Sequence, residues 1–149
     1  MGKRLWVERN KDGSWDAFSE DGAHIKFGKG RGQFTPGDLM KVALAGCAAL
    51  SSQFAVEHTL GDGKGAKIVV DGTYDADTDA YIGFDEQVVI DATDAGLSDE
   101  DAEKLADRVS RHIEKGCTVK HTYVEPTPVR MNVTCLLYTS PSPRDRSLS

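Results

Sequence analysis

The sequence predicts an α+β fold in which antiparallel sheets surround two central helices, in the order βββ-α-ββ-α-β. Three observations support this prediction. Short apolar runs separated by Asp-Gly turns occupy the first thirty residues, as in antiparallel hairpins. A long and almost wholly apolar segment follows Thr35-Pro36, as in a core helix, and a one-sided apolar stripe follows Ser98, as in an amphipathic helix.

The N-terminal region is expected to form three short strands, over residues 5–7, 15–19 and 24–27. Residues 11–14 and Asp21-Gly22 provide the two turns between them. In residues 24–27 polar and apolar side chains alternate, which is typical of a half-buried strand. The glycine-rich residues 28–32 then predict a mobile loop.

A helix is predicted from Pro36 to about residue 57. Thr35 is a good N-cap, Pro36 suits the first helical position, and Asp38 complements the helix dipole. The residues from 39 to 50 are apolar on nearly every side, so we expect a central, buried helix. Small residues dominate around Cys47, which allows another backbone to approach closely there.

Two further strands are expected over residues 67–74 and 81–91, followed by a second helix that begins at Ser98. Acidic residues fill the first turn of this helix, and Gly116 is expected to act as its C-cap. Residues 119–133 should return as one or two strands, with Pro126 and Pro128 restricting where they pair. The apolar stripe of the helix consists of Ala102, Leu105, Ala106, Val109 and Ile113.

The composition changes sharply near the end of the chain. Residues 135–149 contain a Ser-Pro-Ser-Pro run and no periodic pattern, and they resemble translated sequencing-adapter tails. We therefore interpret residues 1–134 as a single domain and residues 135–149 as a non-native tail or, alternatively, a short disordered native one.

The composition also restricts the expected partners and location. The formal charge is −6 without a dense basic stripe, which argues against nucleic acid as a partner. We identify no apolar run close to the ~20 residues of a membrane helix, so no membrane partner is expected. The first residues have no secretory pattern, so we expect a cytoplasmic protein, in which thiols are more often catalytic or inert than disulfide-bonded.

The two cysteines of the predicted domain leave two interpretations open. Cys47 lies inside the first helix, and Cys117 follows the end of the second. A buried thiol is usually inert packing, whereas two thiols at the ends of two helices are able to form a redox couple. The histidines match no zinc spacing, and the Asp75–Asp79 run with Glu86 lacks the glycine and the helices of a calcium loop. No metal or bound cofactor is expected.

The segment FTPGDL (34–39) leading to LAGC (44–47), followed by CTV (117–119) after a second helix, resembles the OsmC/Ohr family of thiol-dependent hydroperoxide reductases and their relatives. The resemblance covers residues 5–133. It implies an intertwined homodimer with sites at the subunit interface. It further implies that Cys47 attacks an organic hydroperoxide as the thiolate, that Cys117 resolves the sulfenic acid as a disulfide, and that an external dithiol reductant restores both thiols.

In that family an arginine, held by a first-turn glutamate, activates the attacking cysteine. Here the first-turn acid is Asp38, one position nearer Cys47 than the usual glutamate, and Thr118 replaces the proline common after the second cysteine. The available cations are Lys26, Lys29 and Arg31, of which we select Arg31, paired with Asp38, as the activating group. The competing interpretation is a non-catalytic OsmC-like stress or binding protein that holds a small apolar ligand at its dimer interface.

Overall fold

The computed structural model describes residues 2–137 of the chain. It divides the chain into two compact units. The first contains the residues up to Pro36 and those from Pro128 onward, and the second is Gly37–Thr127. Both cysteines of the predicted redox couple fall in the second unit.

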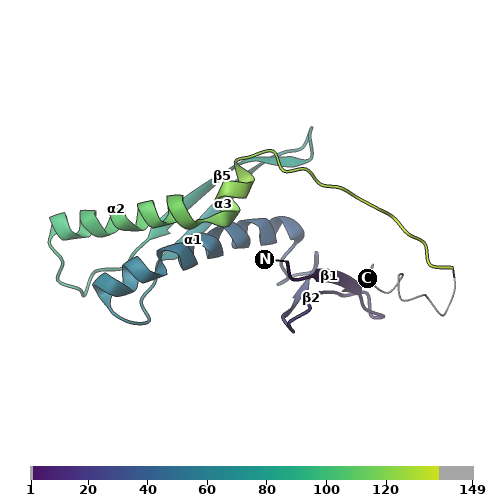
Figure 1. Ribbon diagram of the computed structural model, residues 1–149, viewed down its shortest axis with the longest axis horizontal. Coiled ribbons are helices and arrows are strands. Elements are labelled where there is room, and N and C mark those ends of the chain that lie inside the picture. Colours follow the sequence, from purple (N-terminus) through teal and green to yellow (C-terminus); the bar gives the residue numbers. More distant parts are fainter. Residues whose placement is uncertain (1, 138–149) are drawn as a thin grey trace. The chain divides into compact units, whose positions relative to one another are not determined.

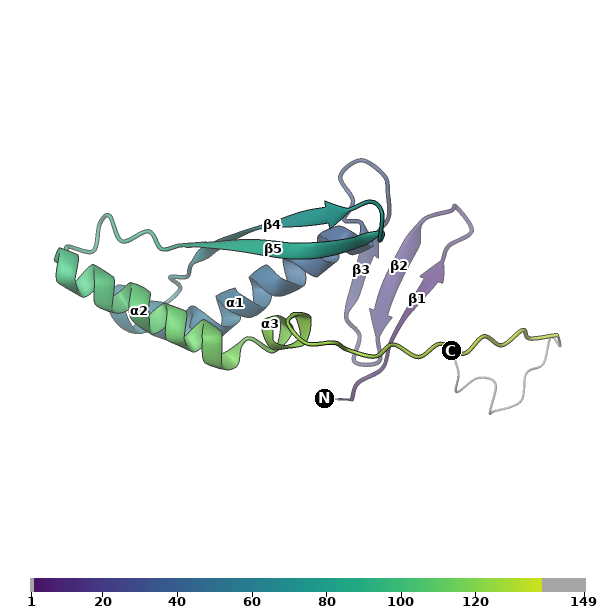
Figure 2. The same cartoon turned by 90° about the horizontal axis from the view of Figure 1, so that it is seen from above.

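The first unit contains a three-stranded antiparallel sheet in the order β1-β2-β3 (Figure 2). Its strands are β1 (Leu5–Arg9), β2 (Trp15–Ser19) and β3 (His24–Phe27), as the sequence predicts. The glycines of the two predicted turns, Gly13 and Gly22, have φ angles of 89° and 95°. Because residues other than glycine rarely adopt such backbone angles, these two glycines set the positions of the turns.

A buried carboxylate connects the three strands of this sheet. Asp16 on β2 is 6% exposed, and its oxygens lie 2.7 Å from the Asn10 side-chain amide and 2.9 Å from His24 Nε2. The Lys26 ammonium lies 3.4 Å away. The hydrogen bonds from Asn10 and His24 hold the pKa of Asp16 below its usual value, so the carboxylate stays ionised and joined to its neighbours.

The second unit packs two long helices and a hairpin around one apolar core. Its elements are α1 (Pro36–Leu60), β4 (Lys67–Asp75), β5 (Ala80–Val89), α2 (Asp99–Gly116) and α3 (Thr118–Tyr123). Helices α1 and α2 run side by side, and the antiparallel β4–β5 hairpin lies along them (Figures 1 and 2). The buried apolar side chains of this core are Leu44, Ala48, Ala55, Val56, Leu105, Val109, Ile113 and Cys117.

Helix α2 confirms its sequence prediction at the start and on its buried face. The Ser98 side chain caps the helix by accepting a hydrogen bond of 3.1 Å from the Asp101 amide. Leu105, Val109 and Ile113 are buried, as the stripe predicts. The predicted C-cap is wrong by one residue: Gly116 is the last helical residue, and Cys117 is the cap, its amide donating to the Ile113 carbonyl at 3.0 Å.

Helix α1 is less buried than the sequence predicts. Its buried side chains lie on one face, whereas Val42, Leu50 and Phe54 are 46%, 74% and 72% exposed. Among the described residues, α1 is the one helix that is long and apolar enough to span a membrane, by length and composition alone. The sequence-based prediction that no apolar segment approaches the length of a membrane helix is therefore wrong. Because α1 shares a core with α2, we interpret it as a core helix of this unit.

The last predicted strand is replaced by a helix. Residues Thr118–Tyr123 form α3, and within the described chain residues 124–137 form no strand. The Cys117 side chain accepts a hydrogen bond from the Lys120 amide, which caps the new helix, and the Val124 amide closes it on the Lys120 carbonyl at 3.2 Å. These local hydrogen bonds, together with the contacts of Tyr123 described below, override the strand propensity of the Thr-Val and Thr-Tyr-Val residues.

Candidate active site

The corner between α2 and α3 lies against the middle of α1. A side-chain carbon placed on Gly116 would be 3.6 Å from Ser51 Oγ, which is ordinary contact distance. The next residue, Cys117, is completely buried in the core, and Cys47 packs against that core from α1 while remaining half-buried. The close approach that the small residues of α1 predict is therefore present beside the two cysteines.

The Cys47 sulfur is surrounded by hydrogen-bond donors. Burial raises the pKa of this thiol, but four hydrogen bonds to the sulfur outweigh burial and lower the pKa below its ordinary value. The donors are the Val119 amide, the Cys117 thiol, the Thr118 amide and the Ser51 hydroxyl. Since each hydrogen bond is stronger to a thiolate than to a neutral thiol, the arrangement favours an ionised Cys47.

The Cys117 sulfur has the opposite preference. Burial raises the pKa of its thiol, and the hydrogen bond to Cys47 and the charges of Cys47 and Glu86 raise it further. The Lys120 amide, which donates to Cys117 Sγ at 3.5 Å, opposes this only in part. The two sulfurs are not joined by a disulfide. These opposite directions favour a proton on Cys117 over one on Cys47.

Helix α3 is held in place from three directions, which fixes the amides that face the two sulfurs. Lys120 Nζ lies 2.5 Å from Glu114 Oε1, and His121 Nε2 donates to the Glu114 carbonyl at 2.7 Å, so α3 is tied to the end of α2. The Tyr123 hydroxyl donates to the Met40 carbonyl of α1 at 2.9 Å. The Tyr123 ring also packs against Phe84 of β5, with a centroid distance of 5.4 Å.

A cavity of about 310 Å³ lies beside this corner. Apolar and aromatic side chains form most of its wall, and Glu86 and Lys120 add two charged groups. Leu44, one helical turn before Cys47, connects the cavity wall with the cysteine-bearing helix. The lining residues are Leu44, Tyr81, Ile82, Gly83, Phe84, Glu86, Lys120, Tyr123 and Val124.

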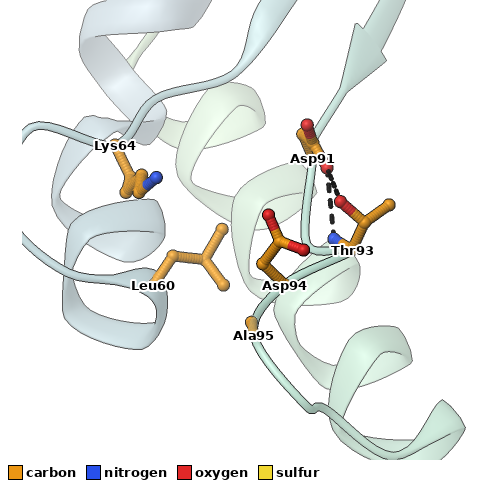
Figure 3. Close-up of a pocket in the computed structure, with 6 residues that line it drawn as sticks. All are labelled: Leu60, Lys64, Asp91, Thr93, Asp94 and Ala95. Carbon is orange, nitrogen blue, oxygen red and sulfur yellow. Dashed lines mark hydrogen bonds between the residues drawn. The ribbon is translucent and has the colours of Figure 1, made fainter.

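A smaller cavity of about 110 Å³ lies at the far end of α1 and contains neither cysteine (Figure 3). The Asp91 carboxylate there accepts hydrogen bonds from the Thr93 amide and hydroxyl, at 3.1 and 2.7 Å. Leu60 in its wall is thirteen residues after Cys47, or about 20 Å along the helix axis. Nowhere in residues 2–137 do three or more ligand side chains gather as a metal ion requires.

The other two predicted site residues are Arg31 and Asp38. Arg31 is exposed in the loop between β3 and α1 and belongs to the first unit. Asp38 is in the first turn of α1, nine residues or about 13 Å along the axis before Cys47. Their role as an activating pair stays a prediction.

Comparison with known proteins agrees with this architecture. No family model matches the sequence. Uncharacterized proteins of Mycobacterium tuberculosis and Mycobacterium bovis are 34% identical to it over 132 residues, which is 87% of this chain and 95% of each relative.

Solved structures show the same fold. An OsmC-like protein of Mycoplasma pneumoniae matches with a TM-score of 0.55 at 18% identity, covering 83% of this chain and 88% of that one. An OsmC-like protein of unknown function from Vibrio cholerae also gives 0.55, at 13% identity, with 82% and 93% covered. The organic hydroperoxide resistance protein OhrB of Bacillus subtilis gives 0.51, at 18% identity, with 82% and 90% covered. The chain has the OsmC-like fold.

The sequence pattern predicted the two cysteines of this OsmC-like fold but not the groups that surround them. Ser51 lies four residues after Cys47, so helical spacing alone would have placed its hydroxyl on the same face. The Thr118 and Val119 amides had no such signal, because they face the sulfur only when residues 118–123 form a helix. Glu86 appeared in the sequence only as part of an unsuitable calcium spacing.

Proposed function

We propose that this protein is an OsmC/Ohr-type thiol-dependent peroxidase that reduces organic hydroperoxides through Cys47 and Cys117. The observation that carries the proposal is the packing of Cys47 on α1 against the core that contains Cys117, an arrangement that lowers the pKa of Cys47 and raises that of Cys117. A peroxidatic sulfur has to be a thiolate, because the thiol is a poor nucleophile. A resolving sulfur has to remain close and unreacted until the first has been oxidised.

The proposed reaction has three balanced steps. The Cys47 thiolate attacks the outer oxygen of the hydroperoxide, the S–O bond forms as the O–O bond breaks, and the alkoxide takes up a proton to leave as an alcohol. The Cys117 thiol then attacks the Cys47 sulfenic acid, forming the disulfide, and its proton leaves with the displaced hydroxide as water. An external dithiol reduces the disulfide by thiol–disulfide exchange and is itself oxidised. No bound cofactor takes part.

The cavity beside the α2–α3 corner supports the choice of an organic substrate. Its wall is mostly apolar and aromatic, including Tyr81, Phe84 and Tyr123, and burial of apolar surface favours a hydroperoxide with a hydrocarbon body. In the competing interpretation, a non-catalytic binding protein, the small apolar ligand would occupy the same cavity. The two interpretations therefore differ in whether Cys47 turns over.

We propose that the active form is a cytoplasmic homodimer. Leu50 and Phe54 expose a large apolar face on α1, a liability in a monomer. Val129, Met131 and Val133 are also exposed, at 91%, 87% and 76%, and their alternate spacing is typical of a strand that pairs along one face. A second copy that covers α1 and pairs with this segment, as the family resemblance implies, would bury both surfaces.

Counting thiols tests the proposed function. In Cys135→Ser protein, which removes the exposed third thiol, one equivalent of cumene hydroperoxide should consume both remaining thiols. Adding Cys117→Ser should instead give one sulfenic acid, trapped by dimedone on Cys47, and adding Cys47→Ser should leave Cys117 reduced. With excess dithiothreitol, the protein with both cysteines should consume many equivalents of peroxide, and the protein with Cys47→Ser should consume none. Unchanged thiol counts would favour the non-catalytic stress or binding protein.

A further inference from the structure

A glutamate that the proposed mechanism does not use lies beside the resolving cysteine. Glu86 on β5 is half-buried, and it lines both cavities that flank the α2–α3 corner, of about 270 and 310 Å³. Its Oε1 atom is buried and has no hydrogen-bond partner. A buried carboxylate oxygen without a donor is expensive to maintain, which suggests that its charge has a use.

The position of Lys120 relates this carboxylate to Cys117. Lys120 lines the same two cavities as Glu86, and its backbone amide donates to Cys117 Sγ at 3.5 Å. Its ammonium group is held by Glu114 at 2.5 Å. Glu86 therefore faces the turn of α3 that carries the Cys117 hydrogen bond, while the nearest cation is engaged by another carboxylate.

We propose that Glu86 is a positioning residue whose negative charge keeps the proton on Cys117, and so keeps the negative charge on Cys47, until Cys47 has been oxidised. This inference rests on the proposed function of the cysteine pair. In this proposal the charge on β5 makes the two thiols different, so that Cys47 is the nucleophile and Cys117 is the hydrogen-bond donor.

The electrostatic environment supports this assignment. The charge of Glu86 adds to burial and to Cys47 in raising the pKa of Cys117, whereas the main influences on Cys47 are burial and its four hydrogen bonds. Burial raises the pKa of Glu86 itself, the Lys120 ammonium lowers it, and Glu114 raises it. The groups that face this cluster are Glu86 from β5, Cys47 from α1, Glu114 from α2, and Lys120 and His121 from α3.

The test uses unreacted protein, so that it does not depend on peroxide chemistry. In a Cys47→Ser, Cys135→Ser background, protein labelled with ¹³C at the cysteine β-carbon reports the titration of Cys117 alone by NMR. Adding Glu86→Gln should lower the Cys117 midpoint by roughly half a pH unit. Glu86→Leu, a second neutral variant, should lower it similarly, and Glu86→Asp, which keeps the charge, should restore the parent value.

Asp85→Asn provides the matched control. Asp85 is the preceding residue on β5, so its exposed carboxylate projects to the opposite face of the strand, and its removal should leave the Cys117 midpoint unchanged. The proposal is overturned if the neutral Glu86 variants leave the midpoint where it was, or if Asp85→Asn lowers it equally. A peroxidase-inactive protein that still shows the Glu86-dependent shift would refute the proposed function while leaving the charge effect intact.

Discussion

The Cys47 and Cys117 sulfurs lie within hydrogen-bonding reach of each other, and a hydrogen bond between them lowers the pKa of Cys47 and raises that of Cys117. The bond joins the middle of α1 to the residue between α2 and α3, and it is accompanied by amides from the first turn of α3. Every feature that fixes this turn therefore influences the acidity of Cys47.

Removing the Ser51 hydroxyl should make Cys47 less acidic. Ser51→Ala deletes one of the four hydrogen bonds to the Cys47 sulfur, so we expect the Cys47 midpoint to rise by roughly half a pH unit. The shift is measured by treating the protein with iodoacetamide at different pH values and following alkylation of the Cys47-containing peptide. Ser52→Ala is the matched control, because the Ser52 hydroxyl bonds to the Ala48 carbonyl at 2.9 Å. It should cost about 1 kcal/mol of unfolding free energy or less and leave the Cys47 midpoint unchanged.

Removing the Tyr123 hydroxyl should loosen α3 at its far end. Tyr123→Phe keeps the ring against Phe84 but loses the hydrogen bond to the Met40 carbonyl, so unfolding free energy should fall by about 1 kcal/mol. The Thr118 and Val119 amides should then be held less firmly, and Cys47 alkylation at neutral pH should slow. Tyr74→Phe removes a hydroxyl bonded to Asp79 in the β4–β5 turn, and we expect it to leave Cys47 alkylation unaltered. Equal slowing in both variants would argue against this role for α3.

Charging the exposed face of α1 should disrupt the proposed homodimer. Leu50→Asp and Phe54→Asp place carboxylates where apolar side chains are 74% and 72% exposed in the single chain, so analytical ultracentrifugation should show a shift toward monomer. Lys104→Asp, on the exposed side of α2, is the charge-changing control and should sediment like the parent protein. A parent protein that is already monomeric at micromolar concentration would contradict the proposed assembly.

Glu86 should make the stability of the protein depend on pH in a defined direction. Because burial raises the pKa of Glu86 in the folded state, its contribution to stability is present below the unfolded pKa of about 4.3 and is lost as pH rises through the folded value. Glu86→Gln does not titrate, so its stability relative to the parent should increase between pH 4 and pH 7. Urea denaturation at the two pH values measures this difference, and a constant difference would contradict the raised pKa.

Local signals predicted much of the fold. The Asp-Gly turns set the first sheet, Ser98 set the start of α2, and Thr35-Pro36 set the start of α1. These features depend on a few adjacent residues, which is why sequence patterns predict them well. The identity of the last element depends instead on contacts of Tyr123 with Met40 and Phe84. The sequence therefore predicts strand from residue 119 onward, whereas residues 118–123 fold as a helix.

The candidate site also contains features that local sequence patterns predict and features that they do not. The positions of Cys47 and Cys117 were predictable from the helix pattern and the family resemblance. The family resemblance led to Arg31, paired with Asp38, as the activating group, and it gave no indication of the donors in the first turn of α3. The lowered pKa of Cys47 in the second unit arises from hydrogen bonds with α3, Ser51 and Cys117, which no local pattern indicates.

The most direct test of the account is the acidity of each thiol in the reduced protein, measured by the pH dependence of iodoacetamide alkylation with peptide mass spectrometry. Because the pKa of Cys47 is lowered, its thiolate persists to a lower pH than that of a free cysteine, whose pKa is ~8.5. The midpoint of alkylation of the Cys47 peptide should therefore lie below the midpoint of a free cysteine. The Cys117 peptide should have its midpoint above that value. A Cys47 midpoint at or above that of a free cysteine would contradict the central claim that this sulfur is the poised nucleophile of the pair.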